Sequence, residues 1–140
     1  MFRRLTDSMY VSPQISVDQV DAAKAMGVTM IINNRPDDEE PGQVNGAEIE
    51  AAAKAAGLGY AAVPVSHGGF APWQLDGMAA ALEQAGTGKV LAYCRSGTRS
   101  ITLDALANPE GLDPATLIAT AKAAGYDLSA LAPRLNARNG

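Results

Sequence analysis

The sequence predicts an α/β fold, with a mostly parallel central sheet and helices on both faces. Short apolar runs alternate with longer, alanine-rich segments along the 140 residues. Residues 28–32 form a β-branched and apolar run of the kind that is buried on both faces of a parallel sheet. Gly27 and Gly57 each follow an alanine-rich segment, at the place where a helix commonly ends. Strands and helices are therefore expected in alternation.

The first strand is expected at residues 10–15. Because Pro13 lacks a backbone N–H group, this strand is predicted at an edge of the sheet. Ser16 is a suitable N-cap for the helix that follows. Further strands are predicted at 28–32, 60–65 and 89–93, the last of them central, and helices at 17–26, 46–57, 72–86, 100–108, 113–125 and 127–135.

Composition and charge limit the function classes. Apolar residues make up 47% and charged residues 19% of the chain, which indicates a globular protein, and the length suits a single domain, residues 1–140. The net charge of -4 and the lack of a basic stripe argue against a nucleic-acid partner. No segment resembles a signal peptide or a membrane span, and the single cysteine cannot form an internal disulfide. We therefore expect a cytoplasmic protein without a membrane partner.

The stretch VLAYCRSGTRS, residues 90–100, predicts the functional site. Cys94 directly follows a predicted strand and Ser100 begins a predicted helix, and α/β sheets bind ligands at such junctions. Successive backbone N–H groups of this loop can form an anion-binding nest, because its glycine permits a backbone conformation that other residues resist. An arginine can add two parallel hydrogen bonds to the same anion. The residues expected to bind the anion are Arg95, Ser96, Gly97, Thr98 and Arg99.

Two interpretations of Cys94 are open. The positive end of the following helix and the two arginines of the loop favour the thiolate, which would be a nucleophile facing the bound anion. The alternative is a buried cysteine that serves as a small apolar side chain, which is the commoner fate of cysteines. Such a structural thiol needs neither the glycine nor the arginines of this loop. We therefore predict that Cys94 is a nucleophile.

The residues YCRSGTRS resemble the catalytic loop of the cysteine-dependent protein phosphatases and of the rhodanese sulfurtransferases. Together with YVSPQIS, GVTMIINNRPDDEEPGQ, YAAVPV and AAGYDLSALAPRL, in this order, they are similar to the phosphatase-like domain of beta-lactamase hydrolase-like proteins. The resemblance implies a fold like that of dual-specificity phosphatases, and some members of the family are described as sulfur transferases. It also implies that Cys94 is the nucleophile, that Arg99 clamps the phosphate, and that Ser100 helps the thiolate to leave.

Two features depart from the phosphatase pattern. Four residues separate Cys94 from Arg99, as in rhodaneses, whereas phosphatases have five, and Tyr93 stands where phosphatases usually have histidine. The place of the phosphatase general acid, an aspartate after the strand that matches AAVPV, reads SHGGF here. His67 is a candidate acid, because histidine titrates near neutral pH, or it is a loop histidine without a task. Asp76, inside a predicted helix, ranks below it, and a sulfurtransferase would need no acid.

A second polar loop, NNRPDDEEPGQ at residues 33–43, should lie at the same edge of the sheet. We expect Arg35 to bind substrate from the rim of the site, and Asp37 and Asp38 to be solvated. Trp73 is expected to pack in the core. Too few ligand-type side chains come together for a metal site, and no cofactor is predicted.

Three functions of different classes are open. The first is a cysteine-dependent phosphatase that acts on phosphate esters through a phosphocysteine intermediate. The second is a rhodanese-type sulfurtransferase that carries sulfur as a Cys94 persulfide. The third is an inactive module that binds phosphate or sulfate. We favour the phosphatase, and the expected partner is a small anionic substrate, either a phosphate ester or a persulfide or thiosulfate. The sequence indicates neither the physiological substrate nor the oligomeric state.

Overall fold

The computed structural model describes residues 2–66, 70–108 and 111–139, in which five strands form one sheet in the order β1-β2-β5-β3-β4. The strands are β1 (Arg3–Thr6), β2 (Met9–Ser12), β3 (Val28–Asn33), β4 (Gly59–Ala62) and β5 (Lys89–Tyr93). Neighbouring strands are parallel except β1 and β2, which are antiparallel. The predicted mostly parallel sheet, with residues 89–93 at its centre, is confirmed.

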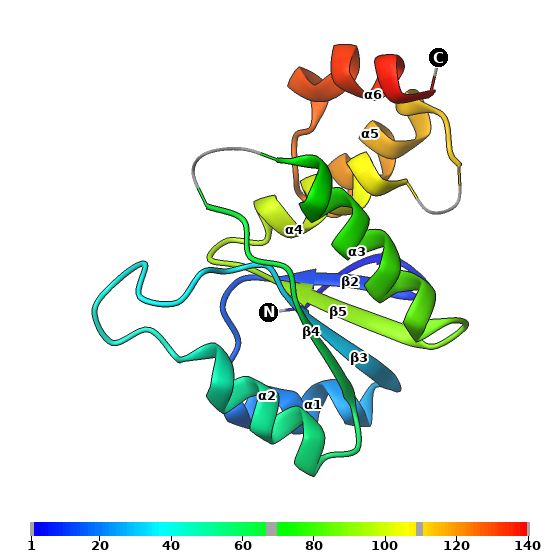
Figure 1. The fold of residues 1–140 in the computed structure, drawn as a ribbon. Coiled ribbons are helices and arrows are strands. Elements are labelled where there is room, and N and C mark those ends of the chain that lie inside the picture. The colour runs from blue at the N-terminus through cyan, green and yellow to red at the C-terminus, as the bar shows by residue number, and fades with distance from the viewer. Residues whose placement is uncertain (1, 67–69, 109–110, 140) are drawn as a thin grey trace.

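Helices cover both faces of this sheet (Figure 1). Helices α1 (Val17–Ala25) and α2 (Gly46–Ala55) pack together on one face, and α3 (Pro72–Ala85) and α4 (Thr98–Ala107) pack together on the other. On the α4 side follow α5 (Pro114–Ala123), a 3-10 turn η1 (Ser129–Leu131) and α6 (Ala132–Asn139). Within the described part of the chain, no helix is both long and apolar enough to cross a lipid bilayer.

Two apolar cores, one on each face, explain why β3 is apolar on both sides. Ile31 and Ile32 are adjacent in this strand and completely buried, but they belong to different cores. Ile31 shares a core with Val20 of α1 and Ile49 of α2, whereas Ile32 shares one with Met78 of α3. Each such buried side chain stabilises the fold by about 1.5–3 kcal/mol. The two cores hold the sheet rigidly. The loops that leave the ends of its strands are therefore attached to fixed points.

Four predictions about single elements are wrong. In place of the helix predicted at 127–135, the chain forms η1 and then α6, which extends to Asn139. Strand β2 lies inside the sheet, because β1 pairs with the side that was expected to be free, and it ends at Ser12, so that Pro13 lies beyond it. The strand predicted at 60–65 ends at Ala62. Trp73, expected in the core, is 58% exposed on the first turn of α3.

Candidate active site

The loop between β5 and α4 carries the cysteine, at the edge of the sheet where the parallel strands end (Figure 1). Cys94 is the first residue after β5 and is completely buried. Its backbone N–H donates to the carbonyl oxygen of Ser12, at the end of β2, at 3.3 Å. The N–H of Asn34, just after β3, donates to the carbonyl oxygen of Tyr93 at 2.8 Å. Three parallel strands thus end at Cys94, where an α/β sheet is expected to bind a ligand.

Gly97 gives this loop its shape. Its φ of 96° lies in the left-handed region, and its backbone N–H donates to Cys94 Sγ at 3.0 Å. The sulfur therefore lies at the N-terminus of α4, where the helix dipole favours negative charge. Ser96 and Thr98 are exposed on either side of the glycine, and their hydroxyl oxygens are 3.1 Å apart. The loop thus directs a backbone amide at the sulfur, as an anion-binding nest would.

Arg99 forms a two-bonded ion pair with Glu39, which lies in the loop between β3 and α2. Both Nη1 and Nη2 of Arg99 donate to the carboxylate at 2.7 Å, and both side chains are largely buried. The hydrogen bonds from Arg99 are the main reason that the pKa of Glu39 falls to about 2, and a bond from Arg35 adds to them while burial opposes them. Glu39 in turn is the main reason that the pKa of Arg99 is raised. Glu39 is therefore ionised at neutral pH.

Glu39 and Val65 do not engage all the donors of the Arg99 guanidinium. It has five N–H groups. The two on Nη1 donate to Glu39 and, at 2.5 Å, to the carbonyl oxygen of Val65, and one on Nη2 donates to Glu39. The second Nη2 hydrogen and the Nε hydrogen are engaged by neither group, and they lie on one edge of the planar guanidinium. Cys94 also contributes to the raised pKa of Arg99, so this guanidinium lies beside the sulfur.

Ser100 lies on the first turn of α4 with its side chain completely buried. Within the described residues its hydroxyl has no hydrogen-bond partner, not even the sulfur of Cys94. A buried hydroxyl without a partner is uncommon and costs free energy. Its hydroxyl is therefore available to a group that binds in the loop.

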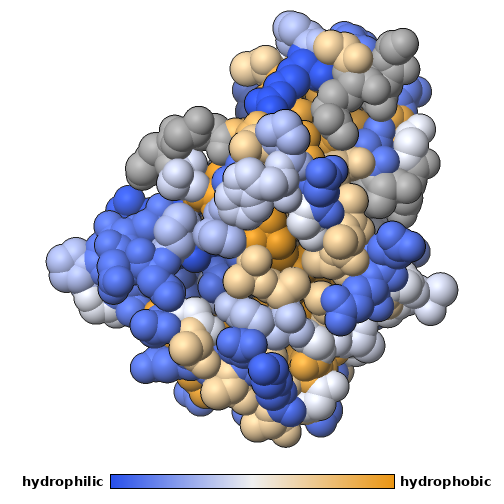
Figure 2. Space-filling view, in the orientation of Figure 1, coloured by the Kyte–Doolittle hydropathy of each residue, from blue (hydrophilic) through white to orange (hydrophobic). Residues whose placement is uncertain are grey.

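Arg35, which was expected at the rim, is buried instead. Its Nε donates to Glu39 at 2.9 Å, its Nη1 to Gln14 at 2.9 Å and its Nη2 to Glu40 at 3.1 Å. Its burial removes it from the solvent-facing rim, and its donors hold the glutamates of its own loop. Arg95 is exposed and forms a weaker ion pair with Glu40 at 3.4 Å. The surface over the β3–α2 loop is accordingly hydrophilic (Figure 2).

Of the remaining predicted residues, the aspartates do not join the site. His67 lies outside the described residues. Asp76 is exposed on α3, and Asp38 is exposed in its loop, as expected for a solvated acid. Asp37 is exposed too, but its carboxylate accepts a hydrogen bond from the backbone of Gly46 at the start of α2. It therefore supports the fold.

Sequence reasoning missed the two glutamates of the β3–α2 loop. Glu39 binds Arg99 and Arg35, and Glu40 binds Arg95 and Arg35. One signal could have found them: two acidic residues follow a parallel strand at the edge that also carries the arginines of the cysteine loop. As a separate observation, no group of three or more His, Cys, Asp or Glu side chains that could hold a metal ion occurs in the part of the chain that the structure describes.

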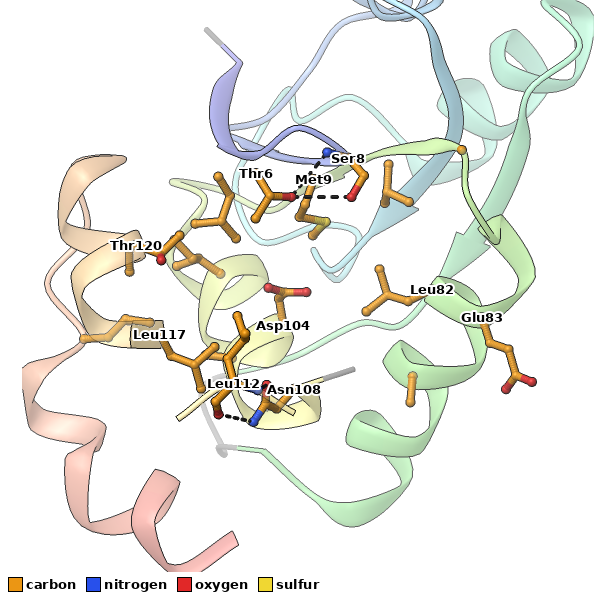
Figure 3. Close-up of a pocket in the computed structure, with 18 of the residues that line it drawn as sticks. Thr6, Ser8, Met9, Leu82, Glu83, Asp104, Asn108, Leu112, Leu117 and Thr120 are labelled. Atoms are coloured by element: carbon orange, nitrogen blue, oxygen red, sulfur yellow. Dashed lines mark hydrogen bonds between the residues drawn. The ribbon is translucent and has the colours of Figure 1, made fainter. Parts of the chain in front are cut away.

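A cavity of about 480 Å³ lies between the β1–β2 turn and helices α3, α4 and α5 (Figure 3). Its lining is mainly apolar, with side chains such as Met9, Leu82, Leu112 and Leu117, and Asp104 is among the polar ones. None of the residues from Cys94 to Ser100 lines it. The cavity therefore has no part in the site at the cysteine.

Known proteins are similar to this chain in sequence. Residues 1–111 match the family model of the phosphatase-like domain of beta-lactamase hydrolase-like proteins. A beta-lactamase hydrolase-like protein of Agrobacterium fabrum is 34% identical over 110 residues, and one of Xylella fastidiosa is 35% identical over 102 residues. These alignments cover 79% and 73% of the chain but 25% and 23% of the relatives. The chain thus spans about a quarter of the length of these curated relatives.

Solved structures share the fold. A candidate phosphatase from Neisseria meningitidis matches with a TM-score of 0.79 and 31% identity, over 97% of this chain and 96% of its own. PTPMT1 and Tk-PTP match with TM-scores of 0.76 and 0.75 at 17% and 16% identity, each over 99% of this chain and over 94% and 95% of their own. The predicted dual-specificity phosphatase fold is confirmed. The chain therefore belongs to the family of phosphatase-like domains of beta-lactamase hydrolase-like proteins.

Proposed function

We propose that this phosphatase-like domain hydrolyses phosphate esters through a phosphocysteine intermediate on Cys94. One observation carries the proposal above all others. The sulfur of Cys94 accepts a hydrogen bond from the amide of Gly97 at the start of α4, beside the guanidinium of Arg99. These positive groups can bind the oxygens of a phosphoryl group and stabilise the negative charge of an attacking sulfur.

The proposed reaction has two steps. In the first, Cys94 Sγ attacks phosphorus, a sulfur–phosphorus bond forms, and the ester oxygen leaves with the electrons of its bond to phosphorus. The free edge of Arg99 and the loop amides stabilise the phosphoryl oxygens. In the second, water attacks phosphorus, the sulfur–phosphorus bond breaks, and inorganic phosphate and the Cys94 thiolate are released. The Ser100 hydroxyl, which does not bond to the sulfur in this structure, is assigned the hydrogen bond to the departing thiolate.

Glu39 cannot supply the proton that the leaving group needs, so another residue must donate it. With a pKa of about 2, Glu39 holds no proton at neutral pH. We assign the proton transfer to His67, on the strength of its place in the sequence after β4. An aryl phosphate, whose leaving group departs without an acid, is therefore the substrate of choice for a first test.

Wild-type protein and a Cys94→Ser variant would be compared on 4-nitrophenyl phosphate. We expect the wild type to release phosphate and the variant to be slower by a factor of about 10³ or more, because a serine hydroxyl is not ionised at neutral pH. Circular dichroism and the melting temperature of both proteins show whether the fold is intact. Equal phosphate release by the two proteins would contradict the proposal.

A sulfurtransferase is the second candidate, because only four residues separate Cys94 from Arg99. In that reaction the thiolate takes the outer sulfur of thiosulfate, sulfite leaves, and cyanide removes the sulfur from the persulfide as thiocyanate. Thiocyanate formation without phosphate release would replace the phosphatase proposal. Inactivity in both assays, together with sulfate binding, would favour the binding module.

We further propose that the substrate is a small phosphate ester. We also propose that residues 1–140 act as one domain and that this domain works in the cytoplasm. The net charge of -4 supports a partner other than nucleic acid. PTPMT1 has been solved in complex with PI(5)P, which is a phosphate ester. Screening of small phosphate esters, with phosphate release as the readout, tests the substrate class.

A further inference from the structure

The tyrosine between α5 and η1 lies against the cysteine loop. The hydroxyl of Tyr126 donates a hydrogen bond to the backbone carbonyl oxygen of Ser96 at 3.1 Å. A methyl group added to Gly97 would collide with that hydroxyl and would come within 2.9 Å of the ring carbon that carries it. Tyr126 therefore touches two successive residues of the loop, although it lies outside residues 1–111 that match the family model.

The peptide unit between Ser96 and Gly97 links this tyrosine to the sulfur. Its carbonyl oxygen accepts from Tyr126, and its N–H donates to Cys94 Sγ at 3.0 Å. In a trans peptide the C=O and N–H groups point in opposite directions. A hydrogen bond that holds the oxygen on one side therefore holds the N–H toward the sulfur on the other.

Tyr126 is itself held in place from two sides. Its backbone N–H donates to the carbonyl oxygen of Ala121 in α5 at 2.9 Å. The guanidinium of Arg3, in β1, lies 5.8 Å from the centre of its ring and donates to the carbonyl oxygen of Ala124 at 3.3 Å. Burial raises the pKa of Tyr126, so its hydroxyl keeps its proton and is a donor at neutral pH.

We propose that Tyr126 is a positioning residue for the nucleophile: its hydroxyl holds the Ser96–Gly97 peptide with the N–H directed at Cys94 Sγ. This inference rests on the proposed function, because it takes Cys94 as the reacting group. Glycine in the left-handed region can rotate more freely than any other residue, so this peptide needs an external restraint. A hydrogen bond to the carbonyl also polarises the N–H, which strengthens its bond to the sulfur.

The test is the pH dependence of alkylation, which reports only on Cys94 because the chain has one cysteine. Tyr126→Phe removes the hydroxyl and keeps the ring, and Tyr10→Phe, in β2, is the matched control. We expect Tyr126→Phe to react with iodoacetamide about tenfold more slowly at pH 7, with the midpoint of its pH profile moved to higher pH. The control should follow the wild-type profile.

The outcomes separate this inference from the proposed function. If the wild type is reactive at neutral pH and Tyr126→Phe has the same profile, the positioning role is wrong and the phosphatase proposal stands. If the wild-type thiol reacts only at alkaline pH, like a free cysteine, both fail. If Tyr126→Phe does not fold, replacement of Tyr126 by 3-fluorotyrosine provides a second test, in which the same alkylation profile is measured below pH 7. As a stronger donor it should move the midpoint to lower pH, and an unchanged or higher midpoint would overturn the inference.

Discussion

Arg99 uses only part of its donors for Glu39 and Val65. Glu39 and the carbonyl oxygen of Val65 use three of its five N–H groups, which fixes the plane of the guanidinium. Neither of these groups engages Nε or the second Nη2 hydrogen, which bind an oxyanion in the proposed reaction. Glu39 thus orients the guanidinium of Arg99 without engaging all of its N–H groups. Arg35, which binds Glu39 from the buried side, keeps that carboxylate in place.

Replacement of Glu39 by glutamine should impair the reaction. The amide accepts through one atom only and presents its NH₂ group to Arg99, so the two-bonded ion pair is lost. We expect kcat/KM for 4-nitrophenyl phosphate to fall about 10²-fold, the loss that a slightly misplaced catalytic group can cause.

Glu50→Gln is the matched control for this substitution. Glu50 pairs with Lys54 on the surface of α2, where such an ion pair is worth little. Its kcat/KM should stay within about twofold of the wild type. An unchanged or higher kcat/KM in Glu39→Gln would mean that the carboxylate competes with the substrate for Arg99.

Cys94, Arg99 and Gly97 could be predicted from the sequence, because one contiguous stretch carries the chemistry of the loop. Glu39 could not be predicted in the same way. It lies 60 residues before Arg99, and the pair forms only because β3 and β5 are neighbours in the sheet. Arg35 was expected at the rim for a different reason: a polar, proline-containing loop gives no sign that it folds over its own arginine.

Among the elements, α4 begins without a side-chain cap, as α3 does after Ala71. Helices α1, α2 and α5 have side-chain caps from Ser16, Asn45 and Asp113, which satisfy backbone N–H groups of the first turn. The N-cap of α4 is Gly97, which has no side chain to offer. The N–H of Thr98 donates to Ser96 Oγ at 3.4 Å, and the glycine offers no side chain to the other N–H groups of the first turn, which can therefore bind an anion.

Gly97→Ala tests the element that joins β5 to α4. The substitution combines a left-handed φ of 96° with the collision against Tyr126, and we expect the loop to lose its shape. Turnover of 4-nitrophenyl phosphate should fall by more than about tenfold. The free energy of unfolding should fall by about 1–2 kcal/mol or more, as judged by urea denaturation.

Gly42→Ala separates the two effects. Gly42 also has a positive φ, 78°, but an added methyl group would meet nothing within 4 Å. Its loss of stability should be about 1–2 kcal/mol, from backbone strain alone, with turnover close to that of the wild type. Wild-type turnover in Gly97→Ala would show that the shape of the loop does not limit the reaction.

In the whole molecule, the alternation of strands and helices and the central place of residues 89–93 could be predicted, because they follow from runs of apolar residues. Strand β1 could not, since its sequence RRLT starts with two exposed side chains. Its addition moves β2 from the edge to the interior of the sheet. It also brings Arg3 to Tyr126, so a strand without an apolar signal supports the loop that carries the cysteine.

The stability of the whole molecule should depend on pH through Glu39. Its pKa falls from 4.5 to about 2 on folding, so between these values the unfolded chain binds more protons than the folded one. The contribution of Glu39 is therefore complete above pH 4.5 and is lost as the pH falls toward 2. Glutamine does not titrate, so the Glu39→Gln variant lacks this pH-dependent contribution to stability.

Urea denaturation at a series of pH values from 5 to about 2.5 measures this effect. We expect the wild type to have the larger free energy of unfolding at pH 5, and its difference from Glu39→Gln to narrow as the pH falls. On unfolding in this range, the variant should take up as much as about one proton fewer than the wild type. Glu50→Gln should run parallel to the wild type, because its exposed partner holds it weakly. Parallel curves for the wild type and Glu39→Gln would contradict the ion pair with Arg99 as a source of stability, and with it the fixed guanidinium on which the proposed phosphate site depends.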